Sequence, residues 1–184
     1  VYYSPYNGKI QDGYMYTDNG FWDTFRAVHP LFTLLYPEVS ERVTQSILNA
    51  YDESGFMPEW ASPGHRECMI GNNSISLLTD AWMKGIRTIC PEKALEAMIH
   101  QTEARHPGIS SVGRDGFGYY DRLGYVPYPE VHEATAKTLE YAYADWCVAR
   151  FADSIGRKEI ADTYYRKALN YRNLYYPCLL YTSD

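Results

Sequence analysis

The connections between the amphipathic stretches of this chain alternate between short and long, and this alternation constrains the fold more than any other feature. Within the stretches, apolar residues recur at spacings of three and four, which indicates helices with one buried face. Two long connections, 56–72 and 109–129, are too rich in Gly, Pro and Tyr to be helical throughout. The expected helices span 20–36, 38–53, 73–84, 92–105, 131–154 and 158–175.

Short links follow the first, third and fifth of these helices, and the long connections follow the second and fourth. In an array of antiparallel helix pairs, both long connections then lie at the end where the first, third and fifth helices begin. Binding groups concentrate on loops held by a rigid helical scaffold. The pattern therefore predicts an all-α fold of the toroid kind with a site at one mouth. A tetratricopeptide-like solenoid is the alternative, but no residue signature recurs at its period of about 34.

The ends and the composition narrow the possible partners. Residues 1–17 have no helical period and are expected to form a short hairpin or extended lead-in that turns at Asn7 and Gly8. The net charge is −6 and Lys and Arg do not cluster, which argues against nucleic acid as a partner. No apolar run reaches the roughly eighteen residues of a membrane span. The four cysteines lack the spacing of a zinc site or a disulfide framework.

The stretch 18–38 carries the most informative cluster of side chains. Asp18 or Asn19 can cap a helix, and Trp22, Asp23 and Arg26 follow at its start. An aromatic plate beside a carboxylate and a guanidinium suits a site that stacks on a sugar ring and hydrogen-bonds its hydroxyls. The simpler interpretation is that Asp23 only interacts with the positive end of the helix.

Further candidates lie in the first long connection and in the fifth helix. Arg66 and Glu67 are either sugar ligands or a solvated pair that contributes little. Asn72 either caps the third helix or offers its amide to sugar hydroxyls. Glu140 fits a buried ion pair or hydrogen bond. Glycoside hydrolysis normally needs two carboxyl groups across the scissile bond, and no convincing pair stands out.

Several segments resemble glycoside hydrolase family 92, the calcium-dependent, exo-acting α-mannosidases of bacteria. The resemblance covers 14–175 and is carried, in order, by FWDTFRAVHPLFTLLYPE, GFMPEW, CMIGNNSISLLTDAWMKGI and TLEYAYADWCVARFA. It implies an inverting hydrolase with an (α/α)6 toroid, preceded by a β-sandwich domain, that removes terminal mannose from N-glycans or yeast mannan. It also implies a periplasmic, secreted or cell-surface location, although the chain shows no export signal.

The resemblance assigns roles to some of the candidates. Trp22 and Asp23 match the family segment that lines the pocket of the terminal mannose, and Arg66 and Glu67 match a loop near it. The family motifs with the general acid, the base and the calcium ligands do not occur here. Residues 1–177 are therefore expected to be the first half of a toroid, with no catalytic or metal-binding residue of its own. The missing half would be its partner, and calcium would bind there.

Two further expectations concern the tail and the alternative functions. Residues 178–184, CLLYTSD, resemble a translated transposase end sequence from a sequencing library and are expected not to be natural protein. Another (α/α)6 carbohydrate-active enzyme, such as an α-glucosidase or trehalase relative, would differ in the sugar accepted. A non-catalytic helical interaction domain would instead bury Trp22 and Asp23 away from any opening.

Overall fold

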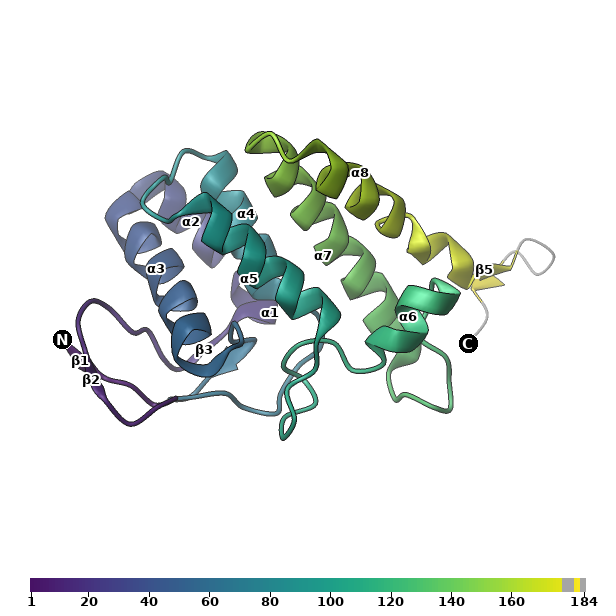
Figure 1. Ribbon diagram of the computed structural model, residues 1–184, viewed down its shortest axis with the longest axis horizontal. Helices are drawn as coiled ribbons and strands as arrows, with labels where there is room; N and C mark the ends of the chain where they lie inside the picture. The colour runs from purple at the N-terminus through teal and green to yellow at the C-terminus, as the bar shows by residue number, and fades with distance from the viewer. Residues whose placement is uncertain (177–180, 183–184) are drawn as a thin grey trace.

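The computed structural model describes residues 1–176 and 181–182, and this part of the chain is mostly helical (Figure 1). Most of the expected non-native tail, 178–184, lies outside the described residues, so that prediction stays untested. None of the helices described has the length and apolarity that a membrane crossing requires. The helices are α1 (Phe21–Thr24), α2 (Val28–Leu35), α3 (Pro37–Ser54), α4 (Asn73–Met83), α5 (Pro91–Glu103), α6 (Phe117–Leu123), α7 (Ala134–Ser154), α8 (Lys158–Lys167) and the 3-10 helix η1 (Asn170–Leu174).

Short antiparallel strand pairs join segments outside the helices. The expected hairpin at the N-terminus is confirmed, because β1 (Tyr2–Tyr3) pairs with β2 (Ile10–Gln11) around a turn in which Gly8 has a φ of +71°. The other two pairs are β3 (Asn19–Gly20) with β4 (Trp60–Ala61), and β5 (Tyr175–Tyr176) with β6 (Tyr181–Thr182).

The expected helix 20–36 is wrong as a single element, because the structure divides it into α1 and α2. Pro30 explains the break. Proline has no N–H to donate, and its ring collides with the carbonyl four residues earlier, here that of Arg26. A regular helix through both residues is therefore disfavoured, and the chain begins a new helix at Val28, where proline falls in the first turn.

Other helix ends follow the signals in the sequence more closely. Pro37 and Pro91 open α3 and α5 as first helical residues, and Gly55 closes α3 with a φ of +81°. The expected helix 158–175 is shorter, since α8 ends at Lys167 and η1 follows. The second long connection contains α6, which the sequence did not predict.

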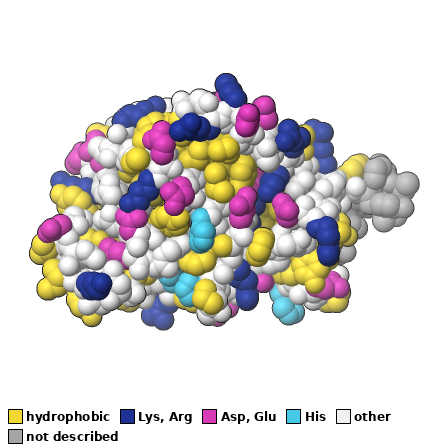
Figure 2. Space-filling view, in the orientation of Figure 1, with side chains coloured by type: hydrophobic (Ala, Val, Ile, Leu, Met, Phe, Trp, Pro, Cys, Tyr) yellow, Lys and Arg dark blue, Asp and Glu magenta, His cyan; other side chains and the backbone are white. Residues whose placement is uncertain are grey.

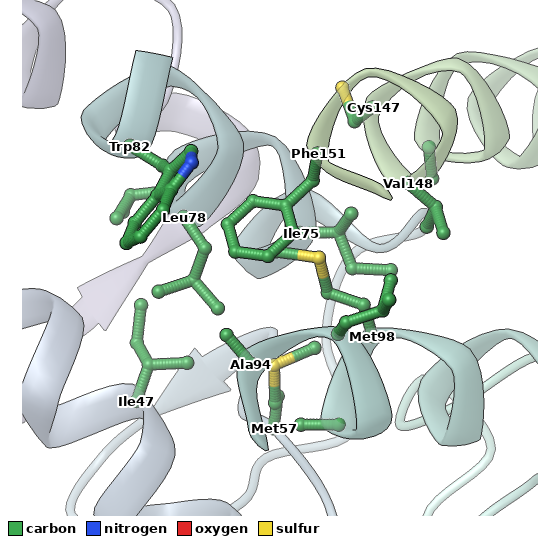
Figure 3. Close-up of a cluster of buried hydrophobic side chains, with 14 of the residues drawn as sticks. Ile47, Met57, Ile75, Leu78, Trp82, Ala94, Met98, Cys147, Val148 and Phe151 are labelled. Carbon is green, nitrogen blue, oxygen red and sulfur yellow. The ribbon is translucent and has the colours of Figure 1, made fainter. Parts of the chain in front are cut away.

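The core lies where α4, α5 and α7 pack together, and α8 runs back along α7 (Figure 1). Phe151 of α7 points toward Ile75 of α4 and Met98 of α5, and all three are fully buried (Figure 3). Met57 from the first long connection joins the same cluster. The helices and the base of this connection therefore share one core.

Glu59 links the first long connection to helices α4 and α5 through hydrogen bonds of its side chain. Its carboxylate is 1% exposed and accepts hydrogen bonds from the Asn73 backbone N–H at 2.7 Å and the Ser74 hydroxyl at 3.1 Å, at the start of α4. The Gln101 amide donates to the same carboxylate at 3.1 Å and to the Met57 carbonyl at 3.0 Å. These hydrogen bonds satisfy the Asn73 N–H, one of the backbone donors that have no partner within the helix at its start.

The stability of the chain is expected to fall as the pH rises from about 4.5 to about 8 because of Glu59. Burial raises the pKa of this carboxyl to about 8, above its usual value of 4.5, so folding takes up a proton between these limits. Each pH unit in that window should cost on the order of 1 kcal/mol. Urea denaturation of wild type and Glu59→Gln at one protein concentration tests this. Parallel pH profiles for the two proteins would contradict it, since glutamine does not titrate.

Candidate active site

The start of α1 is held against the first long connection. The strand pair β3–β4 brings Gly20 so close to Trp60 that a Cβ on Gly20 would lie 2.4 Å from the indole ring. The Phe21 N–H also donates to the Glu59 carbonyl at 3.1 Å. Only glycine fits beside Trp60, and the next residues of α1 therefore lie at the edge of this connection.

Trp22, Arg26 and Glu140 form one cluster at this edge. The indole N–H of Trp22 donates to Glu140 Oε1 at 3.1 Å. The Arg26 guanidinium lies 4.6 Å from the centre of the indole ring and 3.9 Å from the same carboxylate oxygen. Burial raises the pKa of Glu140, and both neighbours counteract this. These contacts hold the indole ring of Trp22, which is partly exposed and is called the aromatic plate below.

Asp23 is exposed beside this plate. Within the described residues its carboxylate makes no hydrogen bond and no ion pair, whereas the carboxylate of Glu140 is engaged. An unpaired carboxylate next to an aromatic ring can accept hydrogen bonds from ligand hydroxyls. Trp22 is half-buried and Asp23 is exposed, so neither side chain is buried, as an interaction domain would have required.

The two long connections meet beside this cluster and form a pocket of about 170 Å³. The Cys68 N–H donates to the Ser111 hydroxyl at 3.1 Å, and that hydroxyl donates to the Arg66 carbonyl at 3.1 Å. This contact confirms the expected convergence of the connections. The lining residues are Glu67, Cys68, Met69, Ile70, Gly71, Ser110, Ser111, Gly113, Glu133, Lys137 and Tyr141.

Left-handed backbone conformations gather around the pocket. Met69 has a φ of +64° and Glu133 a φ of +57°, conformations that cost a residue with a Cβ on the order of 1–3 kcal/mol each. Gly71 and Gly113 line the same pocket at +90° and +77°. At Gly113 a Cβ would lie 2.2 Å from the Ala104 carbonyl oxygen. Such strain is characteristic of binding and catalytic sites.

Comparison of the sequence with known protein families gives one match that covers nearly the whole chain. Residues 1–181 match the sequence model of the glycosyl hydrolase family 92 catalytic domain. The chain belongs to this family. The resemblance expected from the sequence is thereby confirmed.

Solved structures of family 92 enzymes share the fold. The chain is 84% identical to a family GH92 inverting mannosidase from Bacteroides thetaiotaomicron, with a TM-score of 0.95 over 96% of this chain and 24% of that one. A family GH92 alpha-mannosidase from the same organism, in complex with mannoimidazole, is 34% identical with a TM-score of 0.85, over 95% of this chain and 22% of that one.

A curated relative is more distant. An uncharacterized secreted glycosidase from Arthroderma benhamiae is 26% identical over 139 residues, which are 70% of this chain and 18% of that protein. The chain thus spans about a quarter or less of each of these relatives.

The residues of this family 92 chain that are expected to bind the sugar differ in their exposure to solvent. Arg66 is exposed and its Nε donates to the Ser62 carbonyl at 2.7 Å, and Glu67 lines the pocket and accepts a hydrogen bond from the Ser110 hydroxyl. Asn72 lies beneath the surface, 1% exposed. Its side chain bonds the Gly113 carbonyl at 3.1 Å and the Arg114 Nε at 2.7 Å. Their roles in sugar binding, like those of Trp22 and Asp23, stay predictions.

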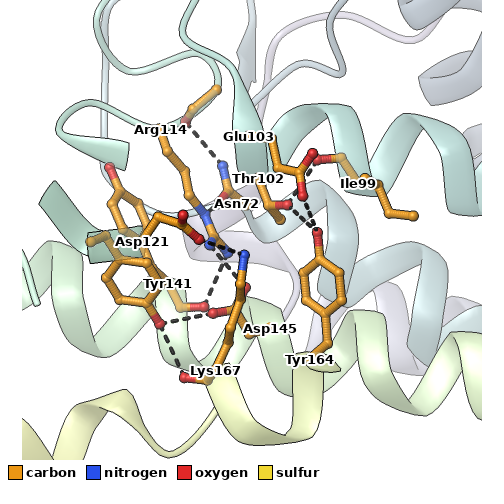
Figure 4. Close-up of polar contacts among 12 residues, drawn as sticks. Asn72, Ile99, Thr102, Glu103, Arg114, Asp121, Tyr141, Asp145, Tyr164 and Lys167 are labelled. Atoms are coloured by element: carbon orange, nitrogen blue, oxygen red, sulfur yellow. Dashed lines mark hydrogen bonds and ion pairs between the residues drawn. The ribbon is translucent and has the colours of Figure 1, made fainter. Parts of the chain in front are cut away.

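A buried ion pair between Arg114 and Asp145, which the sequence did not predict, lies next to the lining residues Gly113 and Tyr141 (Figure 4). Arg114 Nη1 lies 2.8 Å from Asp145 Oδ1, and the two side chains are 1% and 0% exposed. The Tyr120 hydroxyl donates to the same carboxylate at 2.8 Å, and Arg114 Nη2 donates to the Tyr141 carbonyl at 3.1 Å. Arg114 stands between Gly and Asp in a connection without period, so no local pattern marks it as buried.

The expectation that calcium binds outside this chain stays a prediction. The described residues contain no group of three or more His, Cys, Asp or Glu side chains that could hold a metal ion. On the face shown in Figure 2, Lys and Arg side chains are scattered among acidic ones. The arrangement places the indole of Trp22 and the exposed carboxylate of Asp23 near a pocket with polar and apolar lining residues.

Proposed function

We propose that this chain is the first part of an α-mannosidase catalytic domain that removes terminal mannose from α-linked mannosides such as N-glycans or mannan. The observation that carries the proposal is the open pair of Trp22 and the unpaired Asp23 beside a strained pocket, in a chain 84% identical to an inverting mannosidase. The indole stacks on the sugar ring, and the carboxylate accepts hydrogen bonds from its hydroxyls.

Within this proposal the chain binds and orients the terminal sugar, and the rest of the domain supplies the chemistry. An inverting glycosidase needs an acid and a base about 6.5–9.5 Å apart, with room for the attacking water. We place both carboxylates, and the calcium ligands, in the remainder of an (α/α)6 toroid. Calcium would polarise the sugar hydroxyls or the attacking water. The described residues keep the pocket walls and the plate of Trp22 in place.

The proposed activity is tested on the complete protein, recovered by extending the reading frame in the source DNA. We expect release of mannose from α-1,2-mannobiose, with the β-anomer formed first because the reaction inverts the configuration. A calcium chelator is expected to abolish release, and added Ca²⁺ to restore it. Release of the α-anomer, or activity that a chelator leaves unchanged, would contradict the mechanism. Activity on glucosides alone would favour a different toroid glycosidase.

An apolar groove between α7 and α8 marks where the remainder of the domain would pack. Its volume is about 470 Å³, and Trp146 and Leu139 are nearly half exposed in it. Exposed apolar surface of this kind marks an interaction site. Since the chain spans 24% of the mannosidase with which it shares 84% identity, we propose the remaining domain of the same protein as the occupant. The groove is lined by Leu139, Ala142, Tyr143, Trp146, Tyr165, Ala168, Leu169 and Tyr171.

Produced by itself, the chain is therefore expected to self-associate through this groove. Sedimentation velocity over a range of concentrations should show dimers or larger species, and the double variant Leu139→Lys/Trp146→Lys should be mostly monomeric. Tyr3→Lys is the matched control, because Tyr3 is 70% exposed but lies outside the groove. Self-association that persists unchanged in the double variant would assign it to another surface.

We further propose that the complete protein is periplasmic, secreted or attached to the cell surface. The relative from Arthroderma benhamiae is described as secreted, which supports this location.

A further inference from the structure

Glu140 is the residue at which the cluster of Trp22 and the pocket meet. Its side chain is 19% exposed, and its Oε1 contacts the indole N–H of Trp22 and the guanidinium of Arg26. Its other oxygen, Oε2, faces the pocket wall, because a Cβ on Gly71 would lie 2.9 Å from it. One carboxylate of α7 therefore contacts the aromatic plate, the cation above it and the wall of the pocket.

The orientation of the indole depends on this contact. Helix α1 has only four residues, so few intrahelical hydrogen bonds hold Trp22. Indole has a single donor, and Glu140 accepts its hydrogen bond from a residue 118 positions away. A hydrogen bond to a charged acceptor is stronger than one between neutral groups.

The position of Arg26 makes the two faces of the Trp22 indole ring unequal. Its guanidinium covers one face of the indole, 4.6 Å from the ring centre, so a sugar can stack only on the opposite face. The same guanidinium lies 3.9 Å from Glu140. By contacting both the edge of the ring and the cation on its face, Glu140 determines which face of the plate is free.

We propose that Glu140 is a positioning residue, which orients the Trp22 plate for the terminal sugar through its contacts with Trp22 and Arg26. The inference rests on the proposed function, because it assumes that a sugar stacks on Trp22. Stacking holds the bound sugar in the ground state and in the transition state alike. Loss of the orientation therefore raises KM and leaves kcat nearly unchanged.

A double-mutant cycle in the complete protein tests the proposal. Glu140→Leu is expected to raise KM for α-1,2-mannobiose about tenfold with kcat within about twofold. In a Trp22→Leu background the same change should have no further effect, because residues that act through one contact are not additive. Glu140→Gln keeps an acceptor oxygen and should stay within about threefold of the wild-type KM.

The matched control lies on the same helix. Asp153→Leu removes the α7 carboxylate that pairs with Lys158 at the other end of the helix, and it should leave KM unchanged. An unchanged KM in Glu140→Leu, a fall in kcat alone, or additive losses in the double variant would each overturn the proposal.

A second measurement separates this proposal from the proposed function and does not require Glu140→Leu to fold. With ¹⁵N-labelled indole, the Trp22 N–H resonance is assigned by its loss in Trp22→Leu, and it should shift in Glu140→Gln. The resonance of Trp82, whose N–H donates to the Ser154 hydroxyl at 3.0 Å, should not. If the chemical shift of the Trp22 N–H resonance is the same in Glu140→Gln and in the wild type, the positioning role is overturned. A shift in a protein that hydrolyses no mannoside supports that role and overturns only the proposed substrate.

Discussion

Replacing Arg114 with methionine is expected to lower the free energy of unfolding by about 3–5 kcal/mol, because the variant leaves Asp145 buried without its cation. The two groups lie 2.8 Å apart and neither is more than 1% exposed. Burial raises the pKa of the Asp145 carboxyl, and the guanidinium counteracts this. Without Arg114, the carboxyl either stays charged at a large cost or takes up a proton.

Urea denaturation at a fixed protein concentration measures this loss, and two variants serve as references. Lys84→Met breaks an exposed pair, in which Lys84 Nζ lies 2.7 Å from the Asp80 carboxylate, and should cost no more than about 1 kcal/mol. The double variant Arg114→Met/Asp145→Asn should recover part of the loss, because it buries no unpaired charge. If Arg114→Met cost as little as Lys84→Met, the ion pair would not stabilise the fold.

The helices were predictable where a local signal opens or closes them. Pro37 and Pro91 begin helices because the first turn needs no proline N–H, and Gly55 ends one in a left-handed conformation. The lengths of the connections then predicted that both long connections would meet at one end, which the contact of Cys68 with Ser111 confirms. Pro30 signals the break between α1 and α2, but the apolar periodicity continues across it and indicates a single helix.

Helix α6 was not predictable from its own sequence. Gly116, Gly118 and Gly124 punctuate this stretch and indicate a loop. The helix is stabilised by tertiary contacts instead: Tyr120 is 2% exposed and its hydroxyl donates to Asp145 of α7. Packing of this kind overrides local propensity, and the residue that receives the hydrogen bond lies 25 positions away.

The candidate site also has a part that could be predicted from the sequence and a part that could not. Trp22, Asp23 and Arg26 are neighbours within about one turn, so the sequence could point to them together. The contact of Trp22 with Glu140, by contrast, spans 118 positions, and the pair of Arg114 with Asp145 is likewise tertiary. Such contacts have no periodicity of their own, and a single sequence does not reveal them.

Asp23→Ala is expected to reduce kcat/KM of the complete protein for α-1,2-mannobiose about 100- to 10,000-fold. A carboxylate that accepts hydrogen bonds from two sugar hydroxyls contributes about 1.5–3 kcal/mol for each, and each 1.4 kcal/mol corresponds to a factor of about ten. Asp23→Asn keeps acceptor and donor groups but loses the charge, so its activity should lie between those of wild type and Asp23→Ala. Steady-state kinetics on the purified variants provide the measurement.

Glu38→Ala separates this role from the simpler one in which Asp23 only stabilises a helix start. Glu38 is also an exposed acid in the first turn of a helix, α3, so both variants lose the same interaction with the positive helix end. That interaction contributes about 0.3–1 kcal/mol to stability and nothing to sugar binding. Equal activity in the two alanine variants would reduce Asp23 to a helix-start acid, whereas a loss confined to Asp23→Ala would require its carboxylate at the sugar.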